Sequence, residues 1–140
     1  MVAAVSFIVL ILVVAQATAG AVLLARWMRG AGPRSVALTL HVTAGFLTLL
    51  SWSLYLILDS LVAAWVTFVI MTVGNAVGDS MLIKRWRRMT GGTAGFWADY
   101  GSAIAAVFRG AMPGTVAFHA LFAGVVYFTA LGVCIGASIA

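Results

Sequence analysis

The chain has 140 residues, of which 64% are hydrophobic and only 8% are charged, and its mean hydropathy is +1.17. A soluble domain normally carries about 25% charged residues, so this composition excludes a soluble globular domain and predicts one membrane domain over residues 1–140. The net charge of +5 would point to nucleic acid in a soluble protein. Here the basic residues flank apolar segments, so we expect a lipid bilayer with anionic lipids as the partner and no nucleic acid.

Four apolar segments are each long enough to cross a bilayer as a helix, which takes about 20 residues. They cover approximately residues 4–25, 35–58, 61–83 and 114–139. No Lys or Arg precedes the first segment and its apolar run continues to Ala25, so we interpret it as a transmembrane helix and not as a signal peptide. Only helices satisfy their own backbone hydrogen bonds in lipid at these lengths. The sequence therefore predicts an all-α integral membrane protein, a four-transmembrane-helix up-down bundle.

All eight basic residues lie in the first and third connections between these segments. The positive-inside rule places that side in the cytoplasm. We therefore expect a bacterial-type cytoplasmic membrane, with the N- and C-termini outside. The basic residues are Arg26, Arg29, Arg34, Lys84, Arg85, Arg87, Arg88 and Arg109. Aromatic residues also predict two interfacial belts, with Trp52, Tyr55 and Trp65 on the outside and Trp27, Trp86 and Trp97 on the inside.

The third connection has a pattern typical of a short amphipathic helix over residues 94–109. Aromatic and aliphatic residues recur there at near-helical spacing, and Asp99, Ser102 and Arg109 fall largely between them. We expect this helix to lie in the inner interface. Its role is either that of a packing lid under the bundle or that of a partner-docking or gating element.

The two histidines of the chain lie at equal depth in two apolar segments. His41 and His119 each come about two turns after the start of their segment, and an ionisable residue inside a span is by default a functional-site hypothesis. The third segment runs in the opposite direction and brings Asp79 to the same level, where a contact with an imidazole would fix one tautomer. The supporting polar residues that we expect near this level are Asn75, Gln16 and Thr72.

Two facing histidines from diagonal, parallel helices can ligate one haem iron from both sides. Small residues for a packed porphyrin lie near them, with Gly45 one turn from His41 and with Ala120, Ala123 and Gly124 near His119. In this respect alone the organisation resembles the diagonal bis-histidine arrangement of membrane b-type cytochromes. The resemblance implies one haem b, held by His41 and His119, in a small membrane redox subunit that carries out electron transfer. A second histidine pair is absent, which argues against electron transfer across the whole membrane by this chain alone.

Two other functions remain open from the sequence. His41, Asp79 and His119 combine two imidazoles with a carboxylate, which suits zinc or a similar divalent metal, or a proton relay in a transport component. Alternatively, the chain is a cofactor-free structural or assembly subunit of a larger membrane complex.

Small-residue motifs favour the subunit interpretation, because they allow helices to approach closely within the chain, in self-association or with other membrane subunits. The motifs are Gly74-x-x-x-Gly78 and Gly132-x-x-x-Gly136. The chain lacks an intramembrane carboxylate pair, a nucleophilic Ser or Cys with an adjacent His, and a phosphate-binding loop. We therefore do not expect it to be an enzyme on its own.

Overall fold

A computed structural model of the chain describes residues 2–30, 35–92 and 94–139, and this part of the chain is helical without strands. In chain order its elements are α1 (Val2–Arg29), α2 (Val36–Leu58), α3 (Leu61–Thr90), α4 (Phe96–Phe108) and α5 (Gly114–Ser138). Four of them, all except α4, are long and apolar enough to cross a membrane. The predictions of an all-helical chain and of four potential spans are confirmed. Arg34, one of the predicted topology signals, lies outside the described residues.

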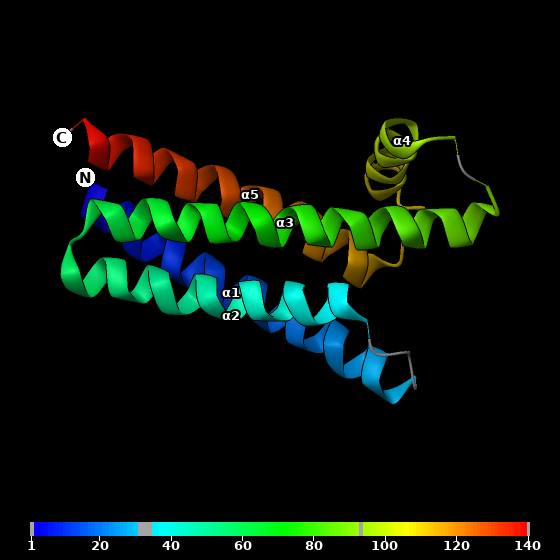
Figure 1. Cartoon of the computed structure of the whole chain (residues 1–140), viewed down its shortest axis with the longest axis horizontal. Helices are drawn as coiled ribbons and strands as arrows, with labels where there is room; N and C mark the ends of the chain where they lie inside the picture. Colours follow the sequence, from blue (N-terminus) through cyan, green and yellow to red (C-terminus); the bar gives the residue numbers. More distant parts are fainter. Residues whose placement is uncertain (1, 31–34, 93, 140) are drawn as a thin grey trace.

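The four long helices run alongside one another, and α4 lies across one end of them (Figure 1). Helices α1 and α3 each contact both α2 and α5. As a result, α1 and α3 occupy opposite corners of the group, and α2 and α5 occupy the other two. Both termini and the turn between α2 and α3 lie at one end, here called the terminal end (Figure 1). The opposite end, here called the basic end, carries Arg26, Arg29 and residues 84–88.

Serine caps begin two of the helices. The Ser35 hydroxyl accepts a hydrogen bond from the Leu38 N–H at 3.1 Å, and the Ser60 hydroxyl accepts one from the Ala63 N–H at 3.4 Å. Each cap satisfies one of the N–H groups that the first turn of a helix leaves without an intrahelical partner. Before Ser60, Asp59 ends α2 in the left-handed conformation with φ of 47°, which Asp tolerates better than most residues. This two-residue connection makes α2 and α3 a tight hairpin.

Helix α3 is longer than its apolar segment. Hydropathy predicts a span that ends near residue 83, whereas the helix continues for about two further turns to Thr90. Lys and Arg, which fill this extension, are good helix formers. The helix ends where Gly91 adopts φ of 73° and donates its N–H to the Arg87 carbonyl at 2.9 Å. The apolar pattern therefore located the buried part of α3 but not its end.

A polar cluster of Ser6, Trp52 and Tyr55 lies inside the terminal end. The Trp52 indole N–H donates to the Ser6 carbonyl at 3.0 Å, and the hydroxyls of Ser6 and Tyr55 are 3.1 Å apart. Trp52 is 0% exposed and Tyr55 is 5% exposed. Trp52 and Tyr55, predicted near the outer interface, therefore face the inside of the chain and not the surroundings. Their polar atoms find partners on α1, so the rings pack in the core instead of at a water interface.

Helix α4 packs its small residues inward and its large aromatic residues outward. Ala103, Ala106 and Val107 are buried in a cluster with Leu82 of α3 and with Met112. The outward side carries exposed Phe96, Trp97 and Phe108. The predicted helix is present, but its faces are divided differently: Val107 is buried while Phe96 and Trp97 are exposed, and the polar Asp99 is buried. This carboxylate is buried instead of lying on the solvated side.

Asp99 is buried because it has two strong partners. Its Oδ2 accepts a charge-assisted hydrogen bond from Arg87 Nε at 2.7 Å, and its Oδ1 accepts one from the Ala94 N–H at 3.1 Å. The Ala94 hydrogen bond, followed by the Arg87 guanidinium, holds the pKa of Asp99 below its ordinary value even though burial opposes this. Asp99 thus remains ionised and fastens α4 to the extension of α3.

Candidate functional site

The structure brings the two histidines together between opposite helices. His41 on α2 and His119 on α5 have ring centroids 5.9 Å apart and ring planes at 81°. Each residue is the sixth of its helix, counted from Val36 and Gly114, so each lies about 8 Å from the helix start at the basic end. Both side chains are half-buried. Helices α2 and α5 make no close backbone contact along their described length, so the two imidazoles reach across the middle of the helix group.

One hydrogen bond sets the orientation of His41. Its Nδ1 lies 3.0 Å from the carbonyl oxygen of Gly74 on α3. A carbonyl only accepts hydrogen bonds, so Nδ1 carries the proton and, in the neutral ring, the Nε2 lone pair is free. We expected Asp79 to fix the tautomer, but Gly74 provides the acceptor in the structure. A backbone carbonyl on the far ring nitrogen is a usual support for a histidine that ligates a metal through its other nitrogen.

Glycines on the neighbouring helices make room for both imidazoles. A Cβ added to Gly78 of α3 would lie 2.9 Å from His41 Cε1, and one added to Gly20 of α1 would lie 3.2 Å from His119 Cε1. Side chains larger than glycine would therefore displace the rings. A Cβ on Gly74 would also come within 3.0 Å of the Ala44 Cβ, so the Gly74-x-x-x-Gly78 motif serves contact between α3 and α2.

The small residues that contact the imidazoles differ from those expected to pack a porphyrin. An added Cβ at Gly45 or Gly124 would meet nothing within 4 Å, so neither glycine contacts a histidine ring. Gly20 was not identified, and Gly78 was identified only as part of a packing motif. The rotation of one helix against its neighbour decides which glycine faces a ring, and a hydropathy pattern does not contain that rotation.

The surroundings of His119 contain polar atoms without partners. Gln16 of α1 donates its Nε2 hydrogen to the backbone carbonyl of His119 at 3.0 Å, which confirms that Gln16 approaches this site. Among the described residues, however, Gln16 Oε1 and His119 Nδ1 are buried and find no hydrogen-bond partner. An unsatisfied buried polar atom costs about 1–3 kcal/mol. Beside the histidine pair, the protein thus has hydrogen-bonding atoms for which its own described groups provide no partner.

Asp79 belongs to a different interaction from the one that we expected. Its Oδ2 accepts a hydrogen bond from the Tyr100 hydroxyl of α4 at 3.2 Å. Burial, followed by the neighbouring Asp79 carboxylate, raises the pKa of Tyr100, so the phenol keeps its proton and donates it. In the part of the chain that the structure describes, no group of three or more His, Cys, Asp or Glu side chains is placed to hold a metal ion. The proposed metal set of His41, Asp79 and His119 gains no support from this arrangement.

The other two predicted supporting residues lie at the edge of the site or away from it. Thr72 is exposed and donates to the Phe68 carbonyl at 2.8 Å, with its hydroxyl 3.2 Å from the Tyr127 hydroxyl. Asn75 is half-buried one turn before Asp79, and no hydrogen bond within the described residues joins it to either histidine. The close surroundings of the pair are therefore formed by backbone and glycines more than by polar side chains.

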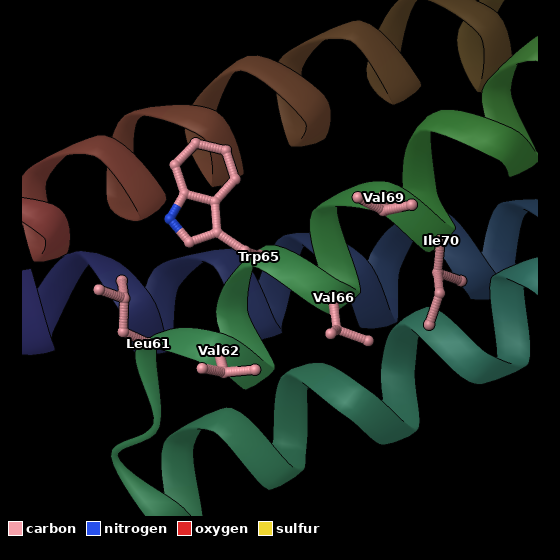
Figure 2. Close-up of a pocket in the computed structure, with 6 residues that line it drawn as sticks. All are labelled: Leu61, Val62, Trp65, Val66, Val69 and Ile70. Atoms are coloured by element: carbon pink, nitrogen blue, oxygen red, sulfur yellow. The ribbon is translucent and has the colours of Figure 1, made fainter.

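An apolar groove on the outer surface of α3 is separate from this site. Figure 2 shows its lining, all from the first part of α3 at the terminal end. The lining residues are Leu61, Val62, Trp65, Val66, Val69 and Ile70. The groove offers apolar contact suited to lipid acyl chains, and it contains none of the polar residues that surround the histidines.

Comparisons with known proteins leave the site to be interpreted from its own geometry. No family model, no curated protein and no solved structure matches the chain. The histidine pair, its glycine surroundings and the polar atoms without partners are therefore the observations on which a function has to be based.

Proposed function

We propose that the chain is a small membrane redox subunit that binds one b-type haem between His41 and His119. The observation that carries this proposal is the distance of 5.9 Å between the two ring centroids on opposite helices. Two metal–imidazole bonds of about 2 Å each, together with the size of the rings, place the centroids of two axial imidazoles about 6 Å apart. The separation of the pair thus suits one iron with a histidine on each side.

The surroundings of the two rings support the same ligand. His41 presents a free Nε2 because Nδ1 bonds the Gly74 carbonyl. A porphyrin held perpendicular to the line between the imidazoles would extend toward the other two corners of the helix group, α1 and α3. Those corners carry Gly20 and Gly78, against which the two imidazoles pack closely, so a flat macrocycle would enter only with a shift of the rings away from these glycines. Bound there, haem supplies reversible one-electron chemistry at its iron.

The position of the histidine pair near the basic end suggests on which side of the membrane electrons are exchanged. Both histidines lie near the basic end, and the chain contains no other histidine. We infer that electrons are exchanged with a partner at the basic side, which the positive-inside rule assigns to the cytoplasm. The outward aromatic residues of α4, Phe96, Trp97 and Phe108, would lie in the inner interface beside anionic lipids. Such a subunit works within a larger electron-transfer chain instead of as an enzyme on its own.

Absorption spectroscopy tests the proposal directly. Protein purified in mild detergent with haem b supplied should show the Soret and α bands of a six-coordinate haem, which sharpen on reduction with dithionite. His41→Ala and His119→Ala should each lose six-coordination and lower haem affinity by more than about 100-fold. Thr72→Val is the matched control, because Thr72 is on α3 but bonds away from the pair. Absence of haem binding, or binding that both histidine variants retain unchanged, would disprove the function.

A further inference from the structure

Helix α4 covers one side of the histidine site. It lies across the basic end of the long helices (Figure 1) and contacts both α3 and α5 there. Its buried residues pack with Leu82 of α3 and with Ala117 and Ala120 of α5. Ala120 follows His119 directly in the chain, and Leu82 lies one turn beyond Gly78, the glycine beside the other imidazole. Helix α4 therefore covers the seam between α3 and α5 close to the level of the two imidazoles.

Two polar contacts between side chains of α4 and α3 hold α4 in this position. Asp99 of α4 accepts a hydrogen bond from Arg87 Nε at 2.7 Å, and the Tyr100 hydroxyl of α4 donates to Asp79 Oδ2 at 3.2 Å. The Asp79 carboxylate is also close enough to His41 for an electrostatic interaction. One of the two contacts that fasten α4 therefore ends beside the histidine pair.

The apolar contact between α4 and the long helices involves small side chains. The buried hydrophobic residues of α4 are Ala103 and Ala106, each 0% exposed, and Val107, which is 4% exposed. Its large hydrophobic residues Phe96 and Trp97 are exposed instead. Because stabilisation by burial scales with the apolar area removed from water, these small residues contribute little for a helix of this length. The closed position of α4 therefore depends strongly on the two polar contacts.

Glycines that flank α4 on both sides allow it to turn relative to α3 and α5. Gly95 has φ of 99° and Gly110 has φ of 70°, conformations that residues with a side chain rarely adopt. A Cβ added to either glycine would meet nothing within 4 Å, so neither position is packed against the rest of the chain. The hinges of moving elements are typically a few residues at the ends of an element, and these two glycines meet that description.

We propose that α4 is a lid, which turns about Gly95 and Gly110 and opens the seam between α3 and α5. In the closed position the contacts of Asp99 and Tyr100 hold the lid, and the histidine pair is covered on this side. In the open position water and small solutes from the basic side reach the two imidazoles. The proposal goes beyond haem binding and does not depend on which ligand the pair takes. It assigns α4 a gating role in addition to its packing under the bundle.

Chemical modification of the histidines tests the lid in the full chain, purified in mild detergent without haem. Diethyl pyrocarbonate modifies neutral imidazoles, and because the chain contains two histidines, mass spectrometry of peptides gives a separate rate for each. Tyr100→Phe should raise these rates by about 2- to 10-fold, and Asp99→Asn combined with Tyr100→Phe by more than about 10-fold. Tyr127→Phe is the matched control, because it removes a hydroxyl that contacts Thr72 away from α4, and it should leave both rates unchanged.

Hydrogen exchange in the same variants determines whether α4 opens by itself. Exchange should accelerate in α4 and stay unchanged in α2. Faster exchange in α4 with unchanged histidine modification would mean that α4 moves without uncovering the pair, and unchanged exchange would mean that the two contacts do not hold it; either result overturns the lid. If exchange in α2 also accelerates in the double variant, that variant is destabilised as a whole and Tyr100→Phe alone decides. Failure of the chain to bind haem leaves all of these results valid, because haem is not present.

Discussion

A polar cluster at the terminal end has all its partners inside the chain, whereas three buried polar atoms toward the basic end have none among the described residues. At the terminal end, Trp52, Tyr55 and Ser6 form a closed set in which the indole N–H and the hydroxyls have partners inside the chain. Toward the basic end, Gln16 Oε1, His119 Nδ1 and Arg85 Nε are buried without a hydrogen-bond partner among the described residues.

The presence or absence of hydrogen-bond partners distinguishes a cluster that stabilises the fold from a candidate binding site. A polar group with a complete set of partners stabilises one helix arrangement and needs nothing further. Buried polar atoms without partners cost free energy, and a chain tolerates that cost where another molecule supplies the missing interactions. We therefore expect the terminal end to contribute mainly to stability, and we propose that the basic end is where a ligand binds. Three substitution experiments test whether the two properties separate in this way.

The largest effect is expected from Trp52→Ala at the terminal end. The substitution removes a side chain that is 0% exposed and leaves the Ser6 carbonyl without its indole donor, so the free energy of unfolding should fall by about 3–5 kcal/mol. Unfolding in mixed micelles with increasing denaturing detergent measures this change. Trp97→Ala is the control, because Trp97 is 79% exposed, and it should stay within about 0.5 kcal/mol. Similar losses for both variants would show that the terminal cluster has no special role.

An intermediate effect is expected from Gly78→Ala at the basic end. The added Cβ would lie 2.9 Å from His41 Cε1, and the ring cannot simply turn away without losing its hydrogen bond to the Gly74 carbonyl. We expect a loss of about 1–3 kcal/mol in unfolding free energy and a clear decrease in haem affinity. Gly132→Ala is the matched control, since a Cβ there meets nothing within 4 Å. Unchanged haem affinity in Gly78→Ala would contradict the dependence of haem binding on the position of the His41 ring beside Gly78.

The smallest effect is expected from Asp99, a polar residue at the basic end that is fully partnered. Its folded-state pKa lies below the ordinary carboxyl value because the Ala94 N–H and Arg87 favour the ionised form. Its stabilisation is therefore present above about pH 4, the range of an unfolded carboxyl group, and is lost as pH falls through the lower folded value. Hydrogen exchange in α4 should accelerate several-fold in that acidic range. Asp99→Asn should exchange faster at neutral pH and show no acid step, and an unchanged step would point to another group.

The sequence is sufficient to predict the helices and the level of the two histidines along them. It is not sufficient to predict which residues surround the histidines. Hydropathy and basic residues give four spans, and a constant rise per residue then places His41 and His119 at one level. The contacts of Gly78 with His41 and of Gly20 with His119 depend on how each helix is rotated against its neighbour. Residue spacing within one segment does not determine that rotation.

The sequence also did not predict which individual polar residues are buried. Tryptophan and tyrosine near a span end are typical of a membrane interface, and nothing in the local pattern distinguishes Trp52 from such a residue. Asp99 similarly looks like part of a solvated helix face. In both cases the decisive partner is distant in sequence or lies on another element: Ser6 for Trp52, and Arg87 for Asp99.

The unequal lengths of the long helices have a consequence for the choice of bilayer. Helices α1 and α3 have 28 and 30 residues, whereas the histidine-bearing helices α2 and α5 have 23 and 25. The shorter pair is about 35–38 Å long, little more than a hydrocarbon core of about 30 Å. A thicker bilayer would reach the ends of α2 and α5 first, and these helices would respond to hydrophobic mismatch before their longer neighbours do. We therefore expect lipid chain length to change the depth of the two imidazoles relative to the basic ends of α1 and α3.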